Sequence, residues 1–224
     1  MPRTGEISIL HSMKRFFRFI SLCCLILPFF IGCSRPGDSI VNKAMTAYSG
    51  KDYDRALTLF EQALESDTRY SPAVLYSFIA NVYMHQEEWT LAAESQGKAM
   101  SLQPDYRGYV MLGMLQHTAG NDEQAEASYR TAIALDAEKG EAYASLGALY
   151  LGQEKPQAAA ELLEKAAALE PKLAVIQANL GVAYAMLSDA EKSDAALAKA
   201  TALKCENIAQ FRARAEEALK TAQN

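Results

Sequence analysis

A repeat of about 34 residues, running from Ser39 onward, constrains the fold of this chain more than any other feature. Its clearest marker is a small residue that recurs at spacings of 36, 33, 34 and 34 residues: Ala56, Ala92, Ala125, Ala159 and Ser193. A Leu-Gly pair recurs in the same register, at Leu112-Gly113, Leu146-Gly147 and Leu180-Gly181. A chain with this period forms one array in which each unit packs on its neighbours, so its 224 residues are not expected to form two globular domains.

The residue pattern within each unit predicts two amphipathic helices joined by a short turn. In the fourth unit, Tyr143, Leu146 and Tyr150 recur at helical spacing, and Leu163 and Ala166 do the same after the turn. The turns carry residues that break or cap helices, at 50–52, 120–122 and 188–189. All 39 alanines follow residue 43, and many of them mark close helix crossings. The sequence therefore predicts an all-α fold, an α-solenoid of about five units.

This pattern resembles the tetratricopeptide repeat (TPR), whose unit is a 34-residue helix–turn–helix. The stretch YASLGALYLGQEKPQAAAELLEKAAALEP carries the motif at Tyr143, Leu146, Gly147, Tyr150, Ala159, Ala166 and Pro171. The resemblance covers five units within about 37–205, and we assign the solenoid to 39–205. The second unit departs from the motif at Gln96, and the fifth departs at Ser193 and Cys205.

A further helix is predicted over 206–224, where an apolar stripe recurs at Ile208, Phe211, Ala215, Leu219 and Ala222. A solenoid needs a terminal unit with a polar outer face, and this helix is expected to be that cap. A partner-binding amphipathic helix is the alternative.

The resemblance also implies a concave groove, lined by the first helix of each unit, that binds a protein or peptide. Mapped position by position, its candidate residues are Met45, Tyr48, Asn81, Met84, His85, Val110, Met114, His117, Leu151, Val182 and Met186. A surface rich in methionine and poor in charge suits an apolar or helical peptide. Any of these side chains could instead pack against a neighbouring helix. Asn81 alone matches the Lys, Asn and Arg set with which one TPR type holds a C-terminal carboxylate, so that binding mode is not expected.

Residues 1–32 have the features of a secretory signal peptide. Three basic residues, Lys14, Arg15 and Arg18, precede an apolar run over 19–31 that is too short to span a bilayer. Met13 is a second possible start, at which the signal would have the usual length.

The signal ends in Phe30-Ile31-Gly32-Cys33, which resembles the bacterial lipobox although leucine is usual in place of Phe30. The resemblance implies that Cys33 carries lipid and that residues 33–38 form a short tether. Ser34 is similar to the pattern that sorts lipoproteins to the outer membrane. Ordinary cleavage near Gly32, giving a soluble periplasmic or secreted protein, is the alternative.

Composition excludes several function classes. The net charge is −5, and without residues 1–32 the chain has 18 basic and 26 acidic residues, a net charge of −8, which disfavours nucleic acid as a partner. His85 and His117 form no metal-binding spacing, and no phosphate-binding loop or nucleophile elbow is present. After removal of the signal and lipidation of Cys33, Cys205 is the one remaining thiol, so no intramolecular disulfide is expected. We therefore expect no enzyme, cofactor or metal site.

Taken together, these features predict a membrane-tethered adaptor or scaffold for protein–protein interactions in the bacterial cell envelope. Its expected location is the outer membrane, facing the periplasm, with an envelope protein or peptide in the groove. The alternative function is a chaperone-like assembly factor of the pilotin type, which would hold an exported or outer-membrane subunit.

Overall fold

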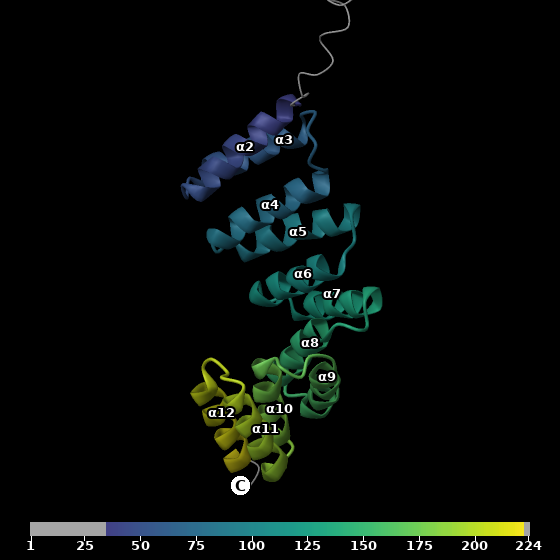
Figure 1. The fold of residues 1–224 in the computed structure, drawn as a ribbon, viewed down its shortest axis with the longest axis vertical. Helices are drawn as coiled ribbons and strands as arrows, with labels where there is room; N and C mark the ends of the chain where they lie inside the picture. Colours follow the sequence, from purple (N-terminus) through teal and green to yellow (C-terminus); the bar gives the residue numbers. More distant parts are fainter. Residues whose placement is uncertain (1–34, 222–224) are drawn as a thin grey trace, which may run out of the picture.

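The computed structural model describes residues 35–221, so the expected signal peptide and lipidation site Cys33 lie outside it. The described residues form eleven helices and no strands, which confirms the predicted all-α solenoid (Figure 1). Five helical hairpins, here called units one to five, follow one another and precede a final helix. They are α2 (Pro36–Ser49) with α3 (Tyr53–Leu64), α4 (Pro72–His85) with α5 (Trp89–Leu102), α6 (Tyr106–Thr118) with α7 (Asp122–Leu135), α8 (Gly140–Gly152) with α9 (Pro156–Leu169), and α10 (Ala174–Met186) with α11 (Ala190–Ala202), followed by α12 (Ile208–Thr221).

In units three, four and five, the two helices cross where a glycine of the first helix meets a large side chain of the second. A Cβ atom on Gly147 would lie 2.7 Å from Cγ of Leu163, and one on Gly181 would lie 2.5 Å from Cγ of Leu197. The small marker Ala159 is fully buried nearby. The repeated small residues are therefore the positions at which one helix can approach the other, and the larger side chains fill the remaining space.

Each hairpin turn places one residue in the left-handed region of backbone space. The φ angles at this position are 61° for Lys51, 60° for Glu87, 82° for Gly120, 55° for Glu154 and 63° for Ser188. The turn geometry thus repeats even though glycine occupies this position only in unit three. The packing of each hairpin therefore offsets the about 1–2 kcal/mol that a non-glycine residue costs in this conformation.

The first helix begins at Pro36, whereas the sequence placed its start at Ser39. Proline suits the first helical turn because the N–H that it lacks would have no partner within the helix. Asp38 is also held in this turn, because its Oδ1 accepts hydrogen bonds from the Thr68 hydroxyl and the Arg69 amide, both at 2.9 Å. The hydrogen bond from the Arg69 amide is the main cause that lowers the pKa of Asp38. The residues from Pro36 to Asp38, expected in the tether, are therefore part of the solenoid.

The apolar interior is divided along the array. One cluster joins unit one to α4 and includes Val41 and Phe60, and a larger one extends from unit three to unit five. Between them, the described chain has a small cluster of Ala99, Met100 and Leu112. Beside it, Gln96 is buried and its side-chain amide donates to the Gly108 carbonyl oxygen at 3.2 Å. The junction of α5 and α6 thus combines a small apolar contact with a buried amide.

The final helix, α12, does not continue the stack in the register of the units. Outside its own unit, the first helix of a unit packs mainly on the second helix of the preceding unit, whereas α12 packs mainly on α10, a first helix. Figure 1 shows α12 beside α10 at the C-terminal end of the array. The Arg214 guanidinium donates from Nη2 to the Leu151 carbonyl oxygen of α8 at 3.0 Å. This helix therefore lies over the first helix of unit five and reaches the end of the first helix of unit four, on the side where the resemblance implies the groove.

None of the helices within residues 35–221 combines the length and the apolar character that crossing a membrane would require.

Candidate protein-binding groove

The candidate groove residues divide into those whose side chains are accessible to solvent and those whose side chains are buried. Met45, His85, Met114 and His117 are exposed, and Tyr48, Asn81, Met84 and Met186 are half-buried. Val110, Leu151 and Val182 are buried, with exposed fractions of 8%, 1% and 0%. The last three therefore contribute to packing in this structure, and their side chains do not line an accessible surface.

The open part of the groove centres on units two and three. Asn81 and Met84 of α4 line a hollow of about 250 Å³ together with residues of α5 and α6. Its full lining is Ser77, Ala80, Asn81, Met84, Gln96, Asp105, Arg107, Gly108 and Met111. Met114 is exposed one helical turn beyond Met111. Methionine side chains thus surround a concave site whose polar groups are mostly amides and hydroxyls.

Of the nine residues that line this hollow, sequence analysis identified Asn81 and Met84 and missed the other seven, among them Met111 and Arg107. Both lie on α6, and Met111 precedes Met114 by three residues while Arg107 precedes Met111 by four. Residues at these spacings share one helix face, so the helical period itself was a signal that could have found them. Arg107 is exposed and adds a cation to a lining whose other charged residue is Asp105.

Polar capping fixes the start of α6 beside the hollow. The Asp105 carboxylate accepts a hydrogen bond from the Gly108 amide at 2.9 Å, which satisfies one unpaired donor at the helix N-terminus. Gly108 also lies against Met100, because a Cβ atom at this position would collide with the methionine Sδ and Cε atoms. This close approach brings α5 and α6 together at the floor of the hollow.

The two candidate histidines contact residues near the hairpin turns. His85 stacks on Tyr53 with ring centroids 5.8 Å apart and meets Tyr48 edge-on at 5.4 Å. His117 Nδ1 lies 2.7 Å from Oδ1 of Asp122. Burial, with a smaller contribution from Tyr53, raises the pKa of Tyr48. Each histidine therefore has a local partner, and no group of three or more potential metal ligands occurs among the residues that the structure describes.

Cys205 lies half-buried in the connection between α11 and α12. Burial raises the pKa of its thiol, and the neighbouring Glu206 raises it further. A raised pKa keeps the group protonated near neutral pH, and the protonated thiol is a poor nucleophile. The environment of Cys205 therefore favours a structural role over reactivity.

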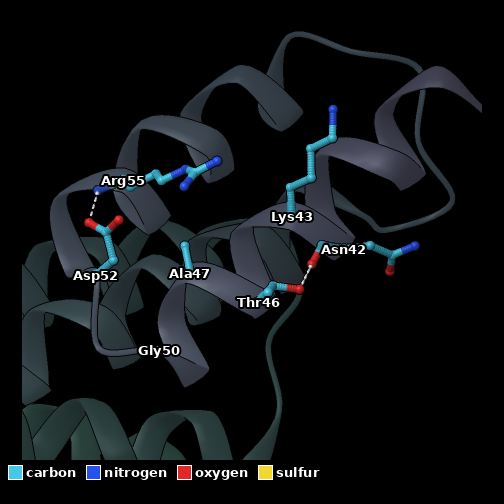
Figure 2. A pocket seen from close by; sticks show the side chains of 7 residues that line it. All are labelled: Asn42, Lys43, Thr46, Ala47, Gly50, Asp52 and Arg55. Carbon is cyan, nitrogen blue, oxygen red and sulfur yellow. Dashed lines mark hydrogen bonds between the residues drawn. The ribbon is translucent and has the colours of Figure 1, made fainter.

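A second hollow, which sequence analysis did not identify, lies in unit one (Figure 2). It measures about 420 Å³ and is lined by Asn42, Lys43, Thr46, Ala47, Gly50, Asp52 and Arg55. Lys43 comes from α2 and Arg55 from α3, and the Arg55 amide donates to the Asp52 carboxylate at 3.4 Å. Its lining includes the charged residues Lys43, Asp52 and Arg55 and, unlike that of the hollow of units two and three, no methionine.

Three segments of the chain match the family model of the tetratricopeptide repeat: residues 37–70, 106–139 and 140–173. The chain is 30% identical over 131 residues to Heat shock protein STI1 of Saccharomyces cerevisiae, which covers 58% of this chain and 22% of that protein. It is 31% identical over 111 residues to TPR repeat-containing protein MJ1428 of Methanocaldococcus jannaschii, covering 49% of this chain and 19% of that protein. The chain thus spans about a fifth of the length of these curated relatives.

Solved structures show the same architecture. A tetratricopeptide repeat protein from Parabacteroides merdae superposes with a TM-score of 0.72 at 15% identity, covering 82% of this chain and 73% of that chain. YrrB, described as a TPR protein with an unusual peptide-binding site, superposes with a TM-score of 0.64 at 24% identity, covering 78% of this chain and 90% of that chain. At these identities the likeness concerns the fold.

Proposed function

We propose that this chain, an α-solenoid in which three segments match the tetratricopeptide repeat model, is a non-enzymatic adaptor that holds a partner protein in the concave groove of units one to three. The observation that carries this proposal is the exposure of methionines on the first helices. Met45 is 38% exposed and Met114 is 42% exposed, and Met84 lies between them in sequence on α4. Large apolar side chains in a concave, open position are typical of a protein-binding surface.

The chemistry of this lining favours an apolar partner segment. Methionine is flexible and polarisable, so a surface of methionines adapts to segments of different shape. The hollow beside Met84 and Met111 accepts an apolar anchor, while the exposed Arg107 at its edge suits an acidic residue that flanks the anchor. We propose that the partner contributes a peptide or helix of this kind.

The proposed location is the bacterial cell envelope. This part of the proposal rests on residues 1–33, which resemble a signal peptide followed by a lipidated Cys33 and lie outside the described residues. Because α2 begins at Pro36, only Ser34 and Arg35 would separate the lipid from the first helical turn. The solenoid would then lie close to the membrane, with unit one nearest, on the outer membrane facing the periplasm. A soluble periplasmic protein is the alternative location.

A second candidate function is a chaperone-like, pilotin-type assembly factor for an exported or outer-membrane subunit. The adaptable methionine lining favours this role too, because it suits transient contact with unfolded or apolar segments. An adaptor would instead bind a folded partner in a stable complex.

Site-specific photo-crosslinking tests the groove. A photo-reactive amino acid in place of Met114 is expected to capture one or a few defined envelope proteins in living cells. The same amino acid in place of Leu135, a residue of α7 that is 49% exposed, is the control and should not capture them. Equal capture from both positions, or capture from neither, would contradict the proposed groove, and capture of many unfolded chains from Met114 would favour the assembly factor.

Membrane tethering has its own test. The Cys33→Ser substitution removes the thiol that would carry the lipid, so the variant is expected to move from the membrane fraction to the soluble fraction. Fractionation followed by immunoblotting measures this shift, with Cys205→Ser as the control that should stay on the membrane. A Cys33→Ser chain that still pellets with the membranes would disprove the tether and leave the groove proposal intact.

A further inference from the structure

The same repeat position carries an exposed side chain toward one end of the array and a buried side chain toward the other. Met45, Met114 and Val182 occupy equivalent places on α2, α6 and α10. The first two are 38% and 42% exposed, whereas Val182 is 0% exposed. The next groove position behaves alike, since His117 of α6 is exposed and its equivalent on α8, Leu151, is 1% exposed. Ala148, the equivalent of Met114 on α8, is half-buried. The concave face is therefore closed at the end of α8 and on α10.

Helix α12 lies over this closed part of the face. Its Ala215 is 2% exposed and forms a buried cluster with Ala185 of α10 and Leu197 of α11, against which Ile208, Phe211 and Leu219 also pack. These α12 residues are spaced three or four apart, so they form one stripe along the helix. An amphipathic helix laid in a groove by its apolar stripe is a common mode of peptide recognition.

A polar contact orients α12 on the face. Leu151 lies in the last turn of α8, and its carbonyl oxygen accepts the hydrogen bond from Arg214 at 3.0 Å. The last carbonyls of a helix have no partner within it and carry partial negative charge, so a guanidinium is well suited to them. Arg214 directly precedes Ala215, which places this contact at the edge of the apolar stripe.

The fit of α12 leaves space beside it. A cleft of about 640 Å³ remains between α12 and the ends of α8, α9 and α10. Its lining is Leu151, Gly152, Glu154, Pro156, Met186, Arg214, Glu217, Ala218 and Thr221. A helix with larger side chains at the positions of Ala218 and Thr221 would fill this cleft better than α12 does.

We infer that the concave face of units four and five is a second protein-binding surface, that α12 occupies it in the free chain, and that an amphipathic helix of a partner protein replaces α12 there. The partner helix would carry an aromatic residue, a small residue and a leucine at intervals of four, with an arginine just before the small residue. This inference depends on the contacts of α12 and not on the methionines of units one to three. Its failure would therefore leave the proposed groove intact.

A matched pair of substitutions in the full chain tests the inference. Ala215→Asp places a carboxylate in the contact between α12 and α10, whereas Ala213→Asp places the same group on the exposed side of the same helix. Hydrogen exchange is expected to become at least tenfold faster in α12 for Ala215→Asp alone, while α10 and α11 keep their protection. The exposed face should then bind a fluorescein-labelled peptide of residues 206–224 at least tenfold more tightly than the Ala213→Asp chain does, because the attached helix no longer competes.

Two results would overturn the inference. If α10 and α11 lose protection together with α12, the helix is an inseparable part of the fold. If the peptide binds both variants equally, the face does not accept a helix from another molecule. A milder pair, Arg214→Ala against Arg212→Ala, removes one side-chain hydrogen bond each, to Leu151 and to Thr201, without adding a buried charge. Faster exchange in α12 for the first of these only is expected, and equal exchange in both would count against the inference.

Discussion

Replacing Gly147 by alanine is expected to destabilise the solenoid, although alanine is the better helix former. The added Cβ would lie 2.7 Å from Cγ of Leu163 and 3.3 Å from the Ala159 carbonyl oxygen. Leu163 is fully buried in the largest core cluster, so neither neighbour can move without disturbing the crossing of α8 and α9. Such overpacking costs about 1–3 kcal/mol of unfolding free energy.

Gly97 provides the matched control. It lies inside α5, and the nearest atom to an added Cβ would be a Leu112 methyl carbon at 4.0 Å. Gly97→Ala should therefore stabilise the chain by about 0.5–1 kcal/mol through helix propensity alone. Urea unfolding of both variants measures the contrast, and the difference between them, about 1–3 kcal/mol, reports the clash at Gly147. If both substitutions stabilise the chain equally, the glycines do not mark close crossings.

The double substitution Met84→Glu with Met114→Glu is expected to lower the affinity for the groove partner by about 100-fold. Each new carboxylate would have to lose water beneath an apolar partner segment, at a cost of about 1–3 kcal/mol. Two such costs sum to about 2–6 kcal/mol, a range that includes the about 2.8 kcal/mol corresponding to a factor of 100. Fluorescence polarisation with the partner segment identified by crosslinking measures the affinity.

The control for this variant changes two exposed leucines of second helices. Leu102→Glu with Leu135→Glu adds the same charge at sites that are 57% and 49% exposed, at the ends of α5 and α7. Both double variants should keep the helical circular dichroism of the parent chain, because all four positions are accessible to water. Unchanged partner affinity in the Met84 and Met114 variant would refute binding in the groove of units one to three.

Much of the fold was predictable because the repeat itself encodes helix crossings. Gly147 and Ala159 recur in register because two backbones approach at those positions, so the period alone specified five hairpins. The family model matches units one, three and four, while the departures from the motif occur in units two and five. Ser193 still fits in unit five because its hydroxyl donates to the Gly181 carbonyl oxygen at 2.8 Å.

The placement of α12 and the true extent of the groove were less predictable. An apolar stripe shows that a helix packs, but it does not show which neighbour it packs against, so the stripe around Ala215 left the contact with α10 undetermined. For the same reason, repeat position alone assigned Val182 and Met114 to one accessible surface. In the structure, α12 lies on the part of the face that contains Val182, whereas Met114 is exposed. Helix α2 begins at Pro36 and not at the predicted Ser39, because Asp38 binds the loop at Thr68, which is distant in sequence.

The junction of α5 and α6, with its small apolar cluster and buried amide, bears on how the solenoid bends when a partner binds. Bending a repeat array changes the spacing between adjacent units, and the resistance at each junction grows with the apolar contact made there. The apolar cluster of Ala99, Met100 and Leu112 is small, and the hydrogen bond of Gln96 reaches directly across it to Gly108. The hollow lined by Met84 and Met111 takes residues from α4, α5 and α6, so it lies across this junction. A partner anchored in the hollow would touch units two and three together and would resist any change in the spacing between them.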